Sequence, residues 1–270
     1  MTSKEETMKK RILITGAGSG FGEGTAIGLA KKGHDVIAGV QIWPQLTRLR
    51  KEAQSLGLKN LRVEKLDILD PYDVANALDW DIDILVNNAA IGYAGPISEI
   101  PIELIGLTFE TNVFGSLNLA QKFIRKFVDE KRSGKIVFIS SVAGLHASSG
   151  LGAYSASKHA LQCIAEVLHD ELKPYNIQVQ TINPAAYKTG FNDAMVETVL
   201  HWMDDTYFHK KADVEKDLKS KFENQRDPKD MIEEMIAIIP EDSGKFRNVF
   251  PKDVEDSLKK AQAAAWENKI

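Results

Sequence analysis

Residues 15–22 read Thr-Gly-Ala-Gly-Ser-Gly-Phe-Gly, between a short β-branched run at 11–15 and an amphipathic segment at 21–32. Glycine at 16, 20 and 22 permits a tight turn. It also lets backbone N–H groups approach a pyrophosphate at the positive end of the following helix. A glycine-rich turn without a ligand has the same composition, so the motif alone leaves both interpretations open.

Short apolar runs alternate with longer amphipathic segments, which is typical of a parallel sheet with helices on both faces. The runs predict seven strands, at residues 11–15, 35–40, 61–65, 82–87, 135–140, 177–183 and 247–250. Helices are expected at residues 21–32, 45–56, 71–78, 104–131 and 154–172, with another after Pro251. The predicted fold class is α/β, with one doubly wound domain over residues 1–270.

The stretch from about residue 190 to 244 interrupts this alternation. It is helical in character, carries mixed charge and contains Met195, Trp202 and Met203. A connection of this length more often covers a site than forms a domain, so we predict a helical substrate lid. Packing of these apolar side chains on the body of the protein explains them equally well.

The composition excludes several classes of function. The net charge is −4 and no basic run is interleaved with aromatic residues, so nucleic acid and membrane surfaces are not expected partners. Residues 1–10 lack the apolar core of a signal peptide, and no apolar stretch approaches the roughly 20 residues that span a bilayer. We therefore expect a cytoplasmic protein. Cys163, the only cysteine, is assigned to the core, and no metal site is expected.

A second motif, Tyr154-Ser-Ala-Ser-Lys158, places a phenol and an ammonium group on one face of an expected helix. A neighbouring ammonium lowers the pKa of a phenol, which is about 10 in water. Tyr154 could then exchange a proton with an alcohol or carbonyl oxygen while a hydride moves. Ser141 follows the expected fifth strand, where its hydroxyl could hold the reacting oxygen. A packed tyrosine beside a lysine that reaches solvent would show the same spacing.

In combination these motifs resemble the classical type of the short-chain dehydrogenase/reductase family. The resemblance covers residues 10–189 and, more loosely, the strand near Phe250. It is carried by motifs that match in order and spacing, at residues 15–22, Asn87-Asn88-Ala89, Asn112, Ser141 and Tyr154–Lys158. It implies a seven-stranded Rossmann domain and an NAD(P)(H)-dependent oxidoreductase that interconverts secondary alcohols and ketones. It also implies a homodimer or homotetramer.

The resemblance assigns a role to each matching residue. Tyr154 would be the acid/base, Lys158 would lower its pKa and bind the nicotinamide ribose, and Ser141 would orient the substrate oxygen. Asn112 would hold a water that links Lys158 to solvent. The implied cofactor-binding set is Gly16, Ser19, Gly20, Phe21, Gly22, Gln41, Asp67, Ile68, Asn88, Ala89, Ala90, Tyr154, Lys158, Pro184 and Thr189.

The choice between NAD and NADP falls at the end of the second strand. An acid there holds the ribose hydroxyls, whereas a base accepts a 2′-phosphate. Val40, Gln41 and Ile42 occupy this place and Ser19 is not basic, so the missing acid favours NADP. Asp67 could contact adenine or cap the next helix, and the resemblance favours the contact.

Two positions depart from the family pattern. Ala90 ends what is usually Asn-Asn-Ala-Gly, and Ala185 follows Pro184 where glycine is usual. Glycine serves where the backbone needs positive φ or close approach, so a methyl group could shift the cofactor. These two residues support an alternative function, a catalytically silent dinucleotide-binding sensor or scaffold. An epimerase or dehydratase that uses the same tyrosine is a third possibility.

Three further residues are expected near the substrate. Tyr93 and Tyr187 lie close to strand ends, and His146 lies in the loop after Ser141. A solvent-facing loop residue is the other interpretation of His146. Together with the expected lid, they predict a moderately large, apolar alcohol or ketone as the substrate.

Overall fold

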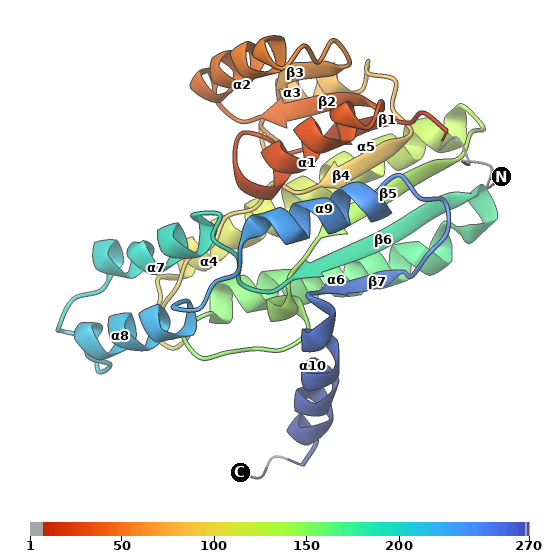
Figure 1. Cartoon of the computed structure of the whole chain (residues 1–270). Coiled ribbons are helices and arrows are strands. Elements are labelled where there is room, and N and C mark those ends of the chain that lie inside the picture. The colour runs from red at the N-terminus through yellow and green to blue at the C-terminus, as the bar shows by residue number, and fades with distance from the viewer. Residues whose placement is uncertain (1–7, 268, 270) are drawn as a thin grey trace.

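The computed structural model describes residues 8–267 and residue 269. A parallel seven-stranded sheet in the order β3-β2-β1-β4-β5-β6-β7 forms its centre (Figure 1). The strands are β1 (Arg11–Ile14), β2 (Asp35–Val40), β3 (Leu61–Lys65), β4 (Ile84–Asn87), β5 (Gly134–Ile139), β6 (Ile177–Pro184) and β7 (Arg247–Phe250). The predicted α/β Rossmann-like fold is confirmed. The expectation of no signal peptide concerns residues 1–10, of which 1–7 lie outside the described residues.

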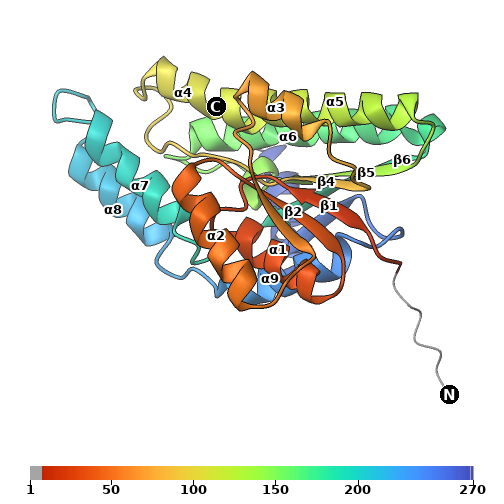
Figure 2. The ribbon, with the colours of Figure 1, turned by 90° about the horizontal axis from the view of Figure 1, so that it is seen from above.

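Helices cover both faces of the sheet, as Figure 2 shows. One face carries α1 (Gly20–Lys31), α2 (Trp43–Ser55) and α9 (Pro228–Ile238). The other carries α3 (Pro71–Ala77), α5 (Ser116–Asp129) and α6 (Gly152–Glu171). Two apolar clusters result, one on each side, and strands buried on both faces need the apolar runs that the sequence shows.

The long helix expected at 104–131 is interrupted. It begins as α4 (Ile102–Phe109), passes through a π-helical segment at Glu110–Gly115 and continues as α5. A π-turn adds one residue to the helical repeat and changes which side chains face inward. It brings Asn112 into a buried position, where only 1% of the residue is exposed. The apolar periodicity of the sequence did not indicate this interruption.

The segment expected as a lid at 190–244 divides into two parts. Its first part, α7 (Phe191–Trp202) and α8 (Lys211–Lys221), projects beyond the carboxyl ends of the strands (Figure 1). Its last part, α9, packs on α1, where Ile232 and Ile236 lie against Gly24 and Gly28. The α9 helix therefore belongs to the helical layer on one face of the sheet, because its apolar side chains are buried against α1. The expected C-terminal helix is present as α10 (Lys252–Ala265).

Cys163 is exposed, so its assignment to the core was wrong. The inward face of α6 is occupied by Leu161, Gln162 and Ala165, which are all buried. Gln162 tolerates burial because its amide donates a hydrogen bond to Asn183. A buried glutamine beside an exposed cysteine reverses the order that hydrophobicity predicts.

Within residues 8–267 and residue 269, no helix has both the length and the apolar composition needed to cross a bilayer. The same residues contain no group of three or more His, Cys, Asp or Glu side chains arranged to hold a metal ion.

Phe123 tests the packing of α5 against the sheet, since it is fully buried. Phe123→Ala should lower the free energy of unfolding by about 3–5 kcal/mol, because the removed ring leaves a cavity. The control Tyr72→Ala, at a residue that is 80% exposed, should change it by less than about 0.5 kcal/mol. Urea denaturation monitors both variants. Equal effects in the two variants would contradict the assignment of Phe123 to the core.

Candidate active site

A cavity of about 950 Å³ lies at the carboxyl ends of the strands, where the strand order reverses between β1 and β4. In open α/β sheets, ligands bind at this reversal point. Its walls are the glycine turn, the loops after β2 to β6, and parts of α7, α8 and α10. The site is therefore assembled from segments that are far apart in the sequence.

The glycine turn has a backbone that requires glycine. Gly16 and Gly20 have φ angles of 62° and 56°. A Cβ atom on Gly16 would lie 2.7 Å from the Cα of Ala89, so no side chain fits there. Thr15 Oγ1 accepts hydrogen bonds of 3.0 Å from the N–H groups of both Asn88 and Ala89. These contacts fix the turn to the end of β4 and leave a backbone cradle at Gly16 and Gly20, which carry no side chain.

Asp67 lines the cavity beside Gln41, at the ends of β2 and β3. Its carboxylate accepts hydrogen bonds from Gln41 Nε2 at 3.1 Å and from the N–H of Leu69 at 3.0 Å. The cap of α3 is Asp70, which accepts from the N–H groups of Tyr72 and Asp73. The helix-cap interpretation of Asp67 is therefore wrong, and its carboxylate lines the cavity.

Two residues of α2 that the sequence analysis missed support this region: Gln45 lines the cavity, and Arg48 contacts the glycine turn. Gln45 Oε1 accepts from the N–H groups of Gln41 and Ile42, at 3.2 and 3.3 Å. The Arg48 guanidinium donates to the carbonyl oxygen of Gly18 at 2.8 Å and pairs with Glu23. Glutamine at the third position of a helix is a known capping signal, so Gln45 could have been found. Arg48 gave no such signal.

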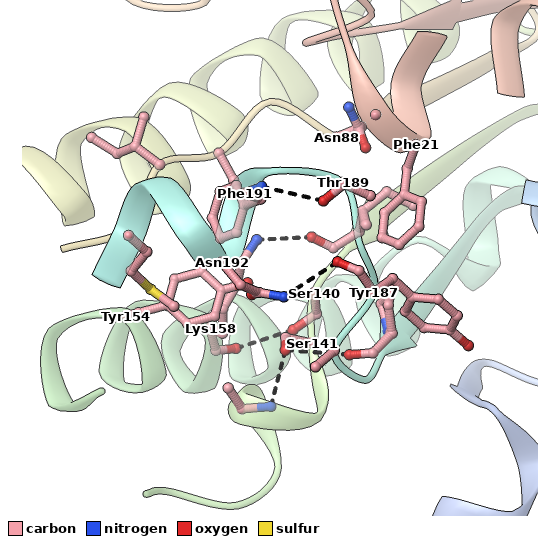
Figure 3. Close-up of a pocket in the computed structure, with 18 of the residues that line it drawn as sticks. Phe21, Asn88, Ser140, Ser141, Tyr154, Lys158, Tyr187, Thr189, Phe191 and Asn192 are labelled. Carbon is pink, nitrogen blue, oxygen red and sulfur yellow. Dashed lines mark hydrogen bonds between the residues drawn. The ribbon is translucent and has the colours of Figure 1, made fainter. Parts of the chain in front are cut away.

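Tyr154 and Lys158 lie one turn apart on α6 and both line the cavity (Figure 3). The Lys158 ammonium donates a 2.9 Å hydrogen bond to the carbonyl oxygen of Ile139 and lies 5.7 Å from the centre of the Tyr154 ring. Only 2% of Lys158 is exposed, so the alternative in which it reaches solvent is wrong. Ser141 lies beside them, where it accepts from the N–H of Ala143 at 3.1 Å.

Burial shifts the two titrating groups in opposite directions. It raises the pKa of Tyr154 to about 12, an effect that a hydrogen bond with Ser141 opposes. It lowers the pKa of Lys158 from 10.5 to about 7. In both cases the apolar surroundings favour the neutral form. Perturbed pairs of this kind in a cavity mark a candidate catalytic site.

Asn112 joins the π-helical segment to the cavity wall without lining the cavity itself. Its amide donates to the carbonyl oxygen of Ile91 at 2.8 Å and to Ser157 Oγ at 3.0 Å, and its Oδ1 accepts from the N–H of Ile91 at 2.8 Å. Ser157 precedes Lys158 on α6. The expected role of Asn112 in holding a water near Lys158 stays a prediction.

The three expected substrate residues differ in position. His146 is exposed and lines the cavity. Tyr187 also lines it, although its ring stacks edge-on against Phe21 at 5.5 Å, is only 3% exposed and belongs to the core. Tyr93 does not line the cavity, which corrects its expected position. The neighbouring Ala94 is hydrogen-bonded to α7 through both its N–H and its C=O. With Ala94 held in this way, Tyr93 is half-buried outside the cavity.

Most of the expected cofactor set lines the cavity. Gly22 does not: it packs beneath Asn88, where a Cβ atom would lie 2.6 Å from the side-chain nitrogen. The sequence analysis missed several lining residues, namely Phe191, Asn192, Lys221, Phe222, Val254, Ser257, Leu258 and Ala261. They come from α7, α8 and α10, whose approach to the site depends on tertiary packing alone.

Ala90 and Ala185 adopt ordinary backbone conformations. Among the described residues, the only non-glycine residues with positive φ are Lys131 and Asn176. The concern that alanine at 90 or 185 forces a strained conformation therefore does not apply.

Comparison with known proteins places the chain in a family. The family model for short chain dehydrogenases matches residues 10–199. An uncharacterised oxidoreductase of Bacillus subtilis is 35% identical over 188 residues, 67% of this chain and 66% of that protein. The 3-ketodihydrosphingosine reductase of Bacteroides thetaiotaomicron is 34% identical over 188 residues, 67% of this chain and 65% of that protein. The match thus spans about two thirds of these relatives' lengths.

Solved structures agree on the fold. A short-chain dehydrogenase/reductase from Burkholderia phymatum in complex with NAD has a TM-score of 0.80 at 22% identity, over 98% of this chain and 97% of that one. A short-chain dehydrogenase from Sphingobium yanoikuyae in complex with NADPH has a TM-score of 0.72 at 24% identity, over 97% and 96%. The protein has the Rossmann-like α/β fold. It belongs to the short-chain dehydrogenase/reductase family, a family of NAD(P)-dependent oxidoreductases.

The burial of Lys158 makes stability depend on pH. The unfolded chain keeps the lysine proton up to its ordinary pKa of 10.5, whereas the folded chain releases it near 7. Folding stability should therefore rise between pH 7 and 9, by at most about 1.4 kcal/mol per pH unit for this group. Lys158→Met should flatten this rise in urea denaturation without coenzyme.

Part of the rise should persist in that variant, because burial also lowers the pKa of Lys135 to about 8. An identical pH dependence in the wild type and Lys158→Met would show that Lys158 is not buried as a neutral amine.

Proposed function

We propose that the protein catalyses the NAD(P)(H)-dependent interconversion of a secondary alcohol and a ketone. One observation carries the proposal: Tyr154 and Lys158 share a cavity wall with the glycine cradle, and Ser141 lies beside the phenol. A proton donor, a neighbouring cation and a place for a dinucleotide are then within one cavity. These are the parts that the reaction needs from the protein.

The residues of the cavity fit a dinucleotide. A side chain is excluded at Gly16, and Gly20 packs against Thr189, where a Cβ atom would lie 3.3 Å from the threonine side chain. The pyrophosphate would lie at the N-terminus of α1, where backbone N–H groups point outward. Asp67 would accept from the adenine amino group. A bound nicotinamide would supply or accept the hydride.

Tyr154 would transfer the proton. Since burial raises its pKa to about 12, the phenol is protonated at neutral pH and can donate to a developing alkoxide. Ser141 would hold the same oxygen. Alcohol oxidation requires the phenolate, which a charged Lys158 stabilises electrostatically. In the isolated site Lys158 loses its proton near pH 7, so this support is strongest below that pH.

An apolar substrate of moderate size is supported by the composition of the cavity near Tyr154. Leu151, Phe191, Met195 and Phe222 line this part and pack in one cluster with Tyr154. We propose that the α7–α8 hairpin is the lid of this region, since Phe191 lies 5.5 Å from the Tyr154 ring, centre to centre. The relative from Bacteroides, named for its action on 3-ketodihydrosphingosine, is consistent with ketone reduction.

A homo-oligomer, either a dimer or a tetramer, is also proposed. Large apolar side chains are exposed on the helices of one face: Ile102 is 71% exposed, Phe114 55% and Val167 50%. A second copy of the chain would bury them. Light scattering during size-exclusion chromatography measures the mass directly.

Tyr154→Phe tests the reaction. The variant should lose at least about 100-fold in kcat for ketone reduction, because no group remains to donate the proton. Binding of NADPH, measured by calorimetry, should stay within about twofold. Tyr175→Phe, at a tyrosine that is 54% exposed, should behave as the wild type. Full activity of Tyr154→Phe towards a panel of aryl, alicyclic and long-chain ketones would refute the mechanism.

We propose NADP(H) as the coenzyme, since β2 ends without an acid and Arg48 donates to Gly18 within the glycine turn. Arg48→Met should weaken the binding of NADP⁺ about tenfold, because the charge-assisted contact that Arg48 would make with the 2′-phosphate is lost. It should leave NAD⁺ binding nearly unchanged. Calorimetric titration of both coenzymes measures this, and an equal loss for both would remove Arg48 from the selection.

A further inference from the structure

Glu99 follows β4 in a surface loop, and only 4% of its side chain is exposed. Its carboxylate accepts from the N–H of Phe208 at 2.7 Å, from the N–H of His209 at 3.3 Å and from His209 Nδ1. All three donors belong to the turn that joins α7 to α8. A carboxylate is costly to bury, and these charge-assisted hydrogen bonds offset that cost.

Residues 91–100, here called the strap, connect this carboxylate to the active site. Asn112 holds the start of the strap at Ile91. The N–H of Gly95 donates to the carbonyl oxygen of Gly150 at 2.8 Å, two residues before α6 begins. The strap is therefore fixed to the loop that leads directly into the helix that carries Tyr154. Any group that the strap holds is positioned relative to the phenol.

The strap also holds the lid along its length. The N–H of Ala94 donates to Thr198 Oγ1 at 3.1 Å, and Trp202 Nε1 donates to the carbonyl oxygen of Ala94 at 3.0 Å. Both partners lie on α7. Beyond Trp202 the turn is mostly exposed, and Phe208 is 74% exposed. Among the described residues, the hydrogen bonds between this turn and the strap are those of Glu99.

The base of the lid is closed independently of the strap. The N–H of Arg226 donates to the carbonyl oxygen of Ala186 at 3.0 Å. The N–H of Lys188 donates to the carbonyl oxygen of Arg226 at 2.9 Å. On the side of α8, Lys221 donates to the carbonyl oxygen of Ser149 at 3.0 Å. The two ends of the lid are thus joined at the base. Its far turn is held by the carboxylate of Glu99, together with Met203, which is buried, and Tyr207, whose ring stacks edge-on against Trp202.

We propose that Glu99 is a positioning residue that holds the lid closed over the substrate, and this inference rests on the proposed function. It acts through α7, whose Phe191 and Met195 line the cavity beside Tyr154. A fixed turn keeps these two side chains against an apolar substrate. A released turn removes one attachment of the lid and leaves the hydrogen bonds of Ala94 to hold α7 to the strap, so that α7 can shift and enlarge the site.

Glu99→Gln is the variant that tests this. It keeps the shape of the side chain but removes its charge, and it places an amide NH₂ opposite the donors of His209. Hydrogen–deuterium exchange of the segment 203–210 should become about tenfold faster. The KM for a bulky apolar ketone should rise about tenfold with kcat within twofold, whereas the KM for a small ketone should change little.

Two further variants separate the proposed role from a general loss of structure. Glu197→Gln removes the same charge from an exposed position on α7 and should match the wild type in both measurements. His209→Ala leaves the two backbone donors in place and should show a smaller effect than Glu99→Gln. The melting temperature and coenzyme affinity of Glu99→Gln should stay close to those of the wild type.

Unchanged exchange in segment 203–210, or an equal loss of activity towards bulky and small ketones, would overturn the inference. A wild-type protein that turns over no carbonyl compound would instead overturn the proposed function. Faster exchange in Glu99→Gln would then still show that Glu99 fixes the turn.

Discussion

The close approach of α6 to β5 is the constraint on which the site depends. Lys158 reaches the carbonyl oxygen of Ile139 only because the helix lies directly on the strand and the loop that follows it. A Cβ atom on Gly144 would lie 2.7 Å from the carbonyl oxygen of Lys158, so this loop admits no side chain there. Ser155 and Ser157 are buried on the same helix, and their small side chains permit the contact. The Tyr-Ser-Ala-Ser-Lys motif is thus a packing requirement as well as a chemical one.

This packing keeps water from the Tyr154 phenol and the Lys158 amine, and burial therefore destabilises the charged form of each group. An ammonium with one carbonyl partner is poorly compensated, and the folded chain without coenzyme therefore tends to release the proton of Lys158. The same dry surroundings keep Tyr154 protonated as a donor. Burial of these two groups costs folding stability, and the shifted pKa values of Tyr154 and Lys158 that result are suited to proton transfer.

Local patterns predicted the sheet, its flanking helices, the glycine turn and the pairing of Tyr154 with Lys158. Each of these depends on residues that are close in sequence. The errors arose where distant segments decide the outcome. The helix expected at 104–131 is interrupted at Glu110–Gly115, where Asn112 bonds Ile91 and Ser157. The α9 helix packs on α1, where Gly24 and Gly28 leave room for it. On α6, Gln162 turns inward and bonds Asn183 of β6, while Cys163 faces outward. The contacts of Arg48 and Glu99 likewise span 25 or more positions.

The contacts of the strap and of α8 with the body of the protein converge at the start of α6. The N–H of Gly95 in the strap donates to the carbonyl oxygen of Gly150. Leu218 of α8 packs against the same glycine, where a Cβ atom would lie 2.9 Å from the leucine side chain. Lys221 contacts Ser149 in the same loop. The loop that leads from Ser141 to Tyr154 is therefore bounded by both attachments of the α7–α8 hairpin. A change in the position of the hairpin acts on the backbone that places the phenol, so substrate enclosure and proton transfer share one mechanical support.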